Sequence, residues 1–210
     1  FQYINFRFYF IKSINYCIHM FAFKKKYFLI IENTKDINLR NIKKYNKFII
    51  IYRNPSNKEN LENLIKFRKQ CRLKLVKFFV ANDIKLGVLL NADGIYLSSH
   101  NKTFKSFNLK KVNFTIIGSA HNANEISHKI KQGCSYILLS KLFLVDYDKE
   151  SPFLDVIKFN SFSFNDSKKL IPLGGIKINN LNKLKSINCE GIALLSEIKK
   201  KPTKIISRLF

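Results

Sequence analysis

The 210-residue chain has no tryptophan, one methionine, seven glycines, four prolines and only 14 acidic residues. Against these acids stand 38 lysines and arginines, so the net charge is +24. Hydrophobic residues make up 46%, which excludes a mainly disordered chain and is enough for one sizeable core. The positive charge predicts an anionic partner: nucleic acid, a membrane surface or a phosphorylated small molecule. An A/T-rich genome would also favour the abundant Lys, Asn, Ile and Phe, so charge alone selects no ligand.

The four cysteines are far apart, and none belongs to a Cys-x-x-Cys pair. Histidine is equally scarce, so the sequence argues against a zinc site. Isolated cysteines in a lysine-rich chain are typical of buried, reduced thiols. We therefore expect a cytoplasmic protein.

The N-terminal segment differs from the rest of the chain in its charge, because no carboxylate precedes Glu32. Segment 1–23 is aromatic and apolar, but basic residues interrupt it before any run of 18 apolar residues, so it predicts no membrane span. It also lacks the continuous apolar core and small-residue cleavage site of a signal peptide. Because the only methionine is Met20, we expect the natural start there, with residues 1–19 as upstream codons read in frame. Residues 1–22 would be an N-terminal extension outside the fold. A targeting arm and an extra helix are the alternatives. Residues 23–210 would then form the folded domain.

Eight short apolar runs recur along the rest of the chain, and four of the seven intervals between their starts are 21 residues. Each run is apolar on both faces, as expected of a buried parallel strand. The runs are Tyr27–Ile31, Phe48–Tyr52, Leu75–Val80, Gly94–Leu97, Thr115–Gly118, Tyr136–Leu139, Leu170–Leu173 and Gly191–Leu194.

Segments with helical spacing lie between these runs. They include Ser56–Gln70, with a cap expected at Ser56, then Asn122–Gln132, which ends at Gly133, and Asn179–Ile187. Alternation of strand and helix at this spacing predicts βαβ units and a parallel sheet. Eight such strands predict a single (β/α)8 TIM barrel, and a doubly wound open sheet is the alternative.

Polar residues or glycines follow almost every apolar run, and in a barrel they would meet at one rim, where the chemistry of this fold lies. In strand order they are Arg53, Asn82-Asp83, Ser98-Ser99-His100-Asn101, Ser119 with His121, Ser140-Lys141, Gly174-Gly175 and Ser196.

The glycine pair and Ser196 follow the seventh and eighth strands, which is the common phosphate site of the barrel fold. Glycines let backbone N–H groups approach an anion closely. We therefore expect Gly174, Gly175 and Ser196 to bind a phosphate, with a simple tight turn as the alternative.

Asn82 and Asp83 could hold a metal-bound phosphate through a carboxylate ligand and an amide hydrogen bond, or either could cap the following helix. Ser119 and His121 could bind or protonate a substrate. The alternative for His121 is a cap or a surface histidine.

Six segments carry a resemblance to a known family: Val80-Ala-Asn-Asp83, Asn91-Ala-Asp-Gly-Ile-Tyr-Leu-Ser98, Ile117-Gly-Ser-Ala-His-Asn122, Gly133-Cys-Ser-Tyr136, Pro172-Leu-Gly-Gly-Ile176 and Gly191-Ile-Ala-Leu-Leu-Ser196. In this order and spacing the chain resembles the thiamine phosphate synthase and thiazole tautomerase superfamily, from about Tyr27 to Leu209. The resemblance implies a transferase that joins a hydroxymethylpyrimidine diphosphate to a thiazole phosphate and releases pyrophosphate.

The resemblance also implies a role for each matched residue. Arg53 and Asn82 would bind the pyrimidine diphosphate, Asp83 would ligate Mg²⁺, Ser119 would contact the pyrimidine and His121 would be catalytic. Gly174, Gly175, Leu195 and Ser196 would hold the thiazole phosphate. The expected partners are thus phosphorylated small molecules. No membrane and, without an RNA-binding motif, no specific nucleic acid is expected, and a homo-oligomer is left open.

Several expected active-site positions are degenerate. Ile51-Tyr-Arg-Asn-Pro55 lacks the Gln and Lys that the family has after the second strand, and Asn101 stands near the expected second Mg²⁺-binding Asp. The family's Thr-Pro-Thr-Lys loop reads Leu144-Val-Asp-Tyr-Asp-Lys149, so Lys141 or Lys149 would have to replace the lost lysine. Two alternatives follow. One is a metal-free thiazole tautomerase-like isomerase with His121 as general acid and base, and the other is a non-catalytic paralogue that binds a phosphate ligand.

Overall fold

The computed structural model describes residues 26–42, 46–56, 59–104, 114–146, 148, 150–163 and 169–208. The N-terminal extension that the sequence predicts, residues 1–22, lies outside these described residues, as does Lys149. Within the described ranges, no helix is long and apolar enough to cross a lipid bilayer.

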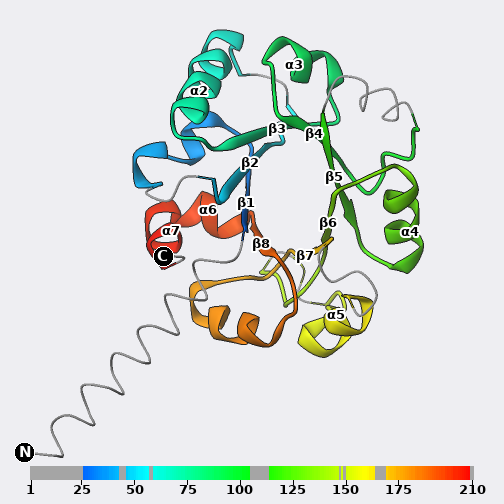
Figure 1. Cartoon of the computed structure of the whole chain (residues 1–210). Coiled ribbons are helices and arrows are strands. Elements are labelled where there is room, and N and C mark those ends of the chain that lie inside the picture. Colours follow the sequence, from blue (N-terminus) through cyan, green and yellow to red (C-terminus); the bar gives the residue numbers. More distant parts are fainter. Residues whose placement is uncertain are drawn as a thin grey trace, which may run out of the picture.

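Eight parallel strands form one sheet that closes into a barrel, with helices on its outside (Figure 1). The strands are β1 (Lys26–Ile31), β2 (Phe48–Tyr52), β3 (Lys77–Ala81), β4 (Gly94–Leu97), β5 (Thr115–Ala120), β6 (Tyr136–Leu139), β7 (Leu170–Pro172) and β8 (Gly191–Leu194). Each of β1 to β6 pairs with the next strand, and β1 also pairs with β8. A parallel bridge between Leu173 and Ala193 joins β7 to β8. The predicted (β/α)8 barrel is therefore confirmed, and the open doubly wound sheet is wrong.

The helices pack around the barrel, and short 3-10 helices supplement them. The α-helices are α2 (Leu61–Leu73), α3 (Ile84–Leu89), α4 (Ala123–Lys131), α5 (Asp155–Ser163), α6 (Ser196–Lys200) and α7 (Pro202–Arg208). The 3-10 helices are η1 (Thr34–Asp36), η2 (Leu39–Asn41) and η4 (Ile178–Ser186). The helix expected over Asn179–Ile187 is thus present, but with 3-10 geometry.

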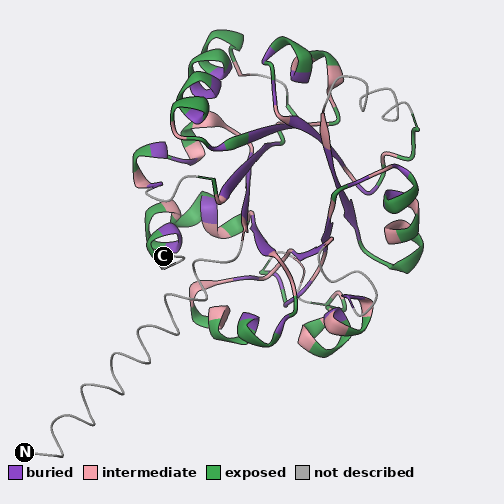
Figure 2. Ribbon diagram, viewed as in Figure 1, coloured by how far each residue is buried: buried purple, intermediate pink, exposed green. Residues whose placement is uncertain are grey.

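The strands bury both of their faces, as their continuous apolar runs predict (Figure 2). In β1, Phe28 and Ile30 belong to the small core inside the barrel, while Tyr27, Leu29 and Ile31 belong to the larger core beneath the helices. Burial of one such large apolar side chain contributes about 1.5–3 kcal/mol to folding. This two-sided core fixes the strand ends that carry the polar residues.

Two element starts differ from the sequence prediction for local reasons. The first helix of the predicted series begins after Asn60, whose side chain accepts a hydrogen bond from the N–H of Glu62 at 3.0 Å. Ser56 is not its cap, because its N–H and hydroxyl both donate to Asn54 Oδ1, at 2.9 and 2.7 Å. Strand β3 starts two residues later than predicted, since Leu75 adopts a φ of 52° in the turn that ends α2.

The predicted limits of α4 are confirmed. Asn122 caps the helix by accepting a hydrogen bond from the N–H of Glu125 at 2.9 Å, and Gly133 ends it with a φ of 76°. Its buried face differs from a simple apolar stripe, however. Ile130 is 41% exposed, whereas Lys129 is completely buried.

Candidate functional site

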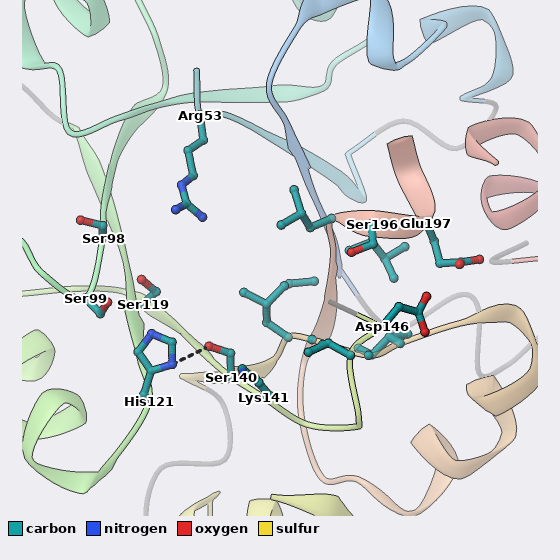
Figure 3. A pocket seen from close by; sticks show the side chains of 18 of the residues that line it. Arg53, Ser98, Ser99, Ser119, His121, Ser140, Lys141, Asp146, Ser196 and Glu197 are labelled. Atoms are coloured by element: carbon teal, nitrogen blue, oxygen red, sulfur yellow. Dashed lines mark hydrogen bonds between the residues drawn. The ribbon is translucent and has the colours of Figure 1, made fainter. Parts of the chain in front are cut away.

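A pocket of about 230 Å³ opens at the carboxyl ends of the strands, where the sequence places its polar residues (Figure 3). Seven of the predicted site residues line it: Arg53, Ser119, His121, Gly174, Gly175, Leu195 and Ser196. Ser98, Ser99, His100, Ser140 and Lys141, also singled out as residues that follow strands, line it as well. The barrel thus brings residues from six strand ends to one cavity.

Arg53 follows β2, and its side chain extends into the pocket from one side (Figure 3). Its backbone N–H donates to the carbonyl oxygen of Ile31 at 2.8 Å, which continues the pairing between β1 and β2 by one residue. The sheet therefore fixes the base of a side chain that carries a permanent positive charge into the pocket.

Tyr96 and Ser119 form a buried polar contact at the pocket. Tyr96 is 2% exposed and Ser119 is 6% exposed. Burial raises the pKa of Tyr96, and the hydrogen bond with Ser119 and the charge of Arg53 offset this only in part. Tyr96 therefore stays a neutral phenol. The sequence does not single it out, because it sits in the middle of an apolar run.

His121 and Ser140 lie together at the mouth of the pocket. Nδ1 of His121 is 3.1 Å from Oγ of Ser140, and the backbone N–H of His121 donates to Glu125 Oε2 at 2.8 Å. The first contact holds the ring and the second holds the backbone. This arrangement can present the other ring nitrogen of His121 to a ligand as an acid or a base.

Gly174 and Gly175 form a turn with φ values of 94° and 67°, which favour glycine. A Cβ at Gly175 would lie 2.4 Å from the carbonyl oxygen of Phe143, so this position has no room for a side chain. Within the described part of the chain, the two glycine N–H groups donate to no acceptor. We call Gly174, Gly175, Leu195 and Ser196 the phosphate cradle, after the ligand that the sequence predicts for them. Free N–H groups beside the hydroxyl of Ser196 are suited to an anion.

Charged side chains around the phosphate cradle are held in ion pairs. Asp146 binds Lys177 and, at 3.0 Å, Lys200, and Lys141 binds Asp148. The hydrogen bonds from Lys177 and Lys200 lower the pKa of Asp146 to about 2. The sequence pattern does not single out Asp146 and Lys177, which also line the pocket. Asp146 lies in the loop after the sixth strand, and Lys177 lies two residues after the glycine pair, and these places are the only signal in the sequence.

Asn82 and Asp83 do not line this pocket. They lie on a second hollow of about 210 Å³, beside Asn54 and Leu86. Asp83 Oδ1 accepts a hydrogen bond from the N–H of Leu86 at 2.9 Å and so caps α3. Asn82 Oδ1 accepts hydrogen bonds from the N–H of Ser98 at 3.1 Å and from Asn101 Nδ2 at 3.2 Å. Among the described residues, no group of three His, Cys, Asp or Glu side chains could hold a metal ion.

Two solved structures share the fold at low sequence identity. Thiamine phosphate pyrophosphorylase from Pyrococcus furiosus superposes with a TM-score of 0.67 at 18% identity, covering 89% of this chain and 97% of that one. The 3-keto-L-gulonate-6-phosphate decarboxylase from Vibrio cholerae gives a TM-score of 0.61 at 12% identity, with the same coverage. At these identities the likeness concerns the fold alone.

Curated relatives carry the name thiamine-phosphate synthase. That of Prochlorococcus marinus (strain AS9601) is 27% identical over 148 residues, which are 70% of this chain and 42% of that protein. That of Bacillus cereus (strain B4264) is 26% identical over 145 residues, 65% of each. The chain thus spans less than two thirds of these relatives. The sequence pattern of the thiamine monophosphate synthase family matches residues 33–198, so the chain belongs to this family.

Proposed function

We propose that the protein is a transferase of the thiamine phosphate synthase type, which joins a hydroxymethylpyrimidine diphosphate to a thiazole phosphate. The observation that carries the proposal is the pocket at the strand ends. It gathers an arginine, a histidine and the phosphate cradle in a member of this family. Its ligands are phosphorylated small molecules.

The phosphate cradle is the proposed site of the thiazole phosphate. The free N–H groups of Gly174 and Gly175 would donate to the phosphate oxygens, together with the backbone of Leu195 and the hydroxyl of Ser196. Lys177 lines the same end of the pocket, and its pairing with Asp146 keeps its ammonium group close to the glycine turn. The proposed phosphate site therefore has directional donors, with the paired ammonium group of Lys177 near them.

The pyrimidine diphosphate would bind between the other end of the pocket, which Arg53 and Ser119 line, and the second hollow, which Asn82 lines. Arg53 and Asn82 would be its ligands, and Ser119 would lie against the pyrimidine. The bond between the pyrimidine methylene carbon and the diphosphate oxygen breaks, and its electron pair leaves with pyrophosphate. The thiazole nitrogen then donates its lone pair to the methylene cation and forms the new C–N bond. The protein contributes positioning and charge stabilisation, and forms no covalent bond to substrate.

Asp83 is the proposed protein ligand for Mg²⁺. The Oδ1 atom of Asp83 caps α3, so Oδ2 would be the metal ligand. The nearby Asn101 is neutral, and its Oδ1 already accepts a hydrogen bond from the N–H of Thr103 at 3.1 Å. Mg²⁺ is often held by one or two carboxylates, water and substrate phosphates. The residues therefore fit an ion that arrives with the diphosphate, where it would neutralise charge on the leaving group.

A thiazole tautomerase-like isomerase is the second candidate, favoured by one observation. His121 is fixed by Ser140 at the mouth of the pocket that Asp83 does not line. An acid and base in that place needs no metal and no diphosphate-binding residues.

The deciding experiment incubates the protein with both thiamine precursors and Mg²⁺ and measures thiamine phosphate and pyrophosphate. Equal amounts of both products are the expected result. Binding of thiazole phosphate without any product, with or without Mg²⁺, would contradict the transferase and leave the non-catalytic binding protein. Proton exchange at the thiazole without coupling would identify the isomerase.

A further inference from the structure

Lys129 of α4 is a fully buried lysine that forms no ion pair with any described residue. Its ammonium group donates instead to three neutral oxygens. These are the carbonyl oxygens of Ser98 and Asn101, each at 2.7 Å, and Oε1 of Gln132 at 2.8 Å. An ammonium group has three protons, so every donor is satisfied.

Burial of this ammonium group costs free energy, which suggests that its hydrogen bonds serve a function. A charged group without a carboxylate partner loses its hydration on burial, and only well-placed acceptors offset that loss. Burial lowers the pKa of Lys129, and the nearby Cys134 and Glu125 raise it by less. The lysine occupies a place on α4 where an apolar side chain would pack at no such cost.

Gln132 completes the attachment from the same helix. It is fully buried, and its Nε2 donates to the carbonyl oxygens of Asn101 at 3.1 Å and Thr103 at 2.7 Å. From the opposite side, Asn82 Oδ1 accepts hydrogen bonds from the Ser98 N–H and from Asn101 Nδ2. The segment after β4 is therefore held between two elements that are distant in sequence.

The barrel wall leaves room for the lysine stem. A Cβ placed on Gly118 of β5 would lie 2.8 Å from Cδ of Lys129 and 3.1 Å from its Cγ. Any larger residue there would displace the stem from its path to the carbonyl oxygens. Gly118 and Lys129 therefore act as one structural unit.

We propose that Lys129 and Gln132 are positioning residues that fix the turn 98–101 as one wall of the ligand pocket. The turn closes through a hydrogen bond from the Asn101 N–H to the Ser98 carbonyl oxygen at 3.0 Å. Its residues Ser98, Ser99 and His100 line the pocket. The inference rests on the proposed function only for the kind of ligand, a phosphorylated small molecule.

The test compares Lys129→Met with Lys131→Met, which removes the same charge from an exposed place on the same helix. Methionine keeps most of the buried stem and removes the donor. Lys129→Met should accelerate hydrogen exchange in residues 98–103 more than in α4. It should also weaken binding of inorganic pyrophosphate about tenfold, because the turn loses the two charge-assisted hydrogen bonds that hold it in place. Lys131→Met should change neither.

Gln132→Met provides a second variant should Lys129→Met fail to fold, because it removes a neutral amide and not a charged group. It should accelerate exchange in the same segment and weaken binding in the same direction. If the double variant adds nothing beyond Lys129→Met, the two residues act as a unit, as their shared acceptor Asn101 predicts. Fully additive effects would instead overturn the joint role.

Unchanged exchange in residues 98–103, or faster exchange with unchanged pyrophosphate affinity, would overturn the inference. Both readouts are independent of turnover. A wild-type protein that binds pyrophosphate but forms no thiamine phosphate would therefore contradict the proposed transferase and still leave the role of Lys129 testable. If the transferase is active, Lys129→Met should raise KM and leave kcat within about twofold, as expected of lost uniform binding.

Discussion

Nδ1 of His121 lies 3.1 Å from Oγ of Ser140, and this contact joins the ends of β5 and β6 at the mouth of the pocket. Neither strand end alone would fix the imidazole, because His121 is otherwise exposed. Substitution of these two residues therefore distinguishes the two proposed reactions, since only the isomerase needs the ring to transfer a proton.

For the transferase we expect His121→Asn to lower thiamine phosphate formation by less than about tenfold, because positioning and charge carry that reaction. Ser140→Ala, which removes only the contact to the ring, should have a still smaller effect. Initial rates with both precursors measure this. A loss of about 100-fold or more in His121→Asn would fit a general acid and base instead.

Asp83→Asn separates the two uses of this carboxylate. Asparagine caps helices as well as aspartate does, so the hydrogen bond to Leu86 and the thermal stability should be retained. The negative charge is lost, so Mg²⁺-dependent turnover should fall by at least about tenfold. Titration of the rate with Mg²⁺ and a thermal melt measure both effects. Unchanged turnover would mean that Asp83 is only a cap.

Ser196→Ala tests the phosphate cradle without disturbing the fold. A hydrogen bond to a charged group contributes about 1.5–3 kcal/mol, so the Kd for thiazole phosphate should rise about 10-fold or more. Calorimetric titration measures this, and the melting temperature should not change. Gly175→Ala should lower both affinity and stability, because its Cβ would lie 2.4 Å from the Phe143 carbonyl oxygen. Normal phosphate binding by both variants would place the phosphate elsewhere.

Two glycines should respond oppositely to alanine. A Cβ at Gly94 in β4 would lie 1.9 Å from the backbone oxygen of Thr115, so Gly94→Ala should destabilise the protein by about 2 kcal/mol or more. At Gly87 in α3 the close neighbour is the flexible end of Ile95, at 2.5 Å, and alanine favours the helix by about 1 kcal/mol. Urea unfolding of the two variants measures the contrast. Equal losses of stability would contradict this contrast and show that the end of Ile95 cannot move aside.

The pairing of Asp146 predicts how stability depends on pH. Its pKa falls from 3.8 to about 2, because Lys177 and Lys200 favour the charged form. A lowered folded pKa stabilises the protein above the unfolded pKa, and this contribution disappears as the pH falls through the folded pKa. The difference in melting temperature between wild type and Asp146→Asn should therefore be present at about pH 5 and vanish near pH 2. A difference that persists at the lower pH would contradict the ion-pair role.

The sequence predicts the strands well, because burial on both faces leaves continuous apolar runs with polar ends. The limits of β2, β4, β6 and β8 match the predicted runs residue for residue. It predicts helix starts less well where a side chain competes for the backbone. At Ser56 the neighbouring Asn54 captures the hydroxyl in a local turn, which the helical spacing of apolar residues does not reveal.

Of the pocket residues, the sequence predicts only those that directly follow the strands. Residues that enter it from loops, such as Asp146, depend on how the loops fold over the barrel. The buried Lys129 was missed although the chain holds a signal, since it lies three residues after Ile126 on the face that packs on β5. From sequence alone, a lysine at this place is expected to keep its ammonium group in water, because its three buried acceptors are visible only in the structure.

The short β7 and its bridge to β8 have a consequence for how the barrel opens. Among the described residues, one bridge, Leu173 with Ala193, joins these strands, whereas neighbouring strands elsewhere share ladders of three or more pairs. Local opening should begin at this junction, where the fewest backbone hydrogen bonds must break. Gly174 and Ser196 lie on opposite sides of it. A phosphate held by both would fasten the two strands together, so ligand occupancy and resistance of the whole barrel to unfolding should rise together.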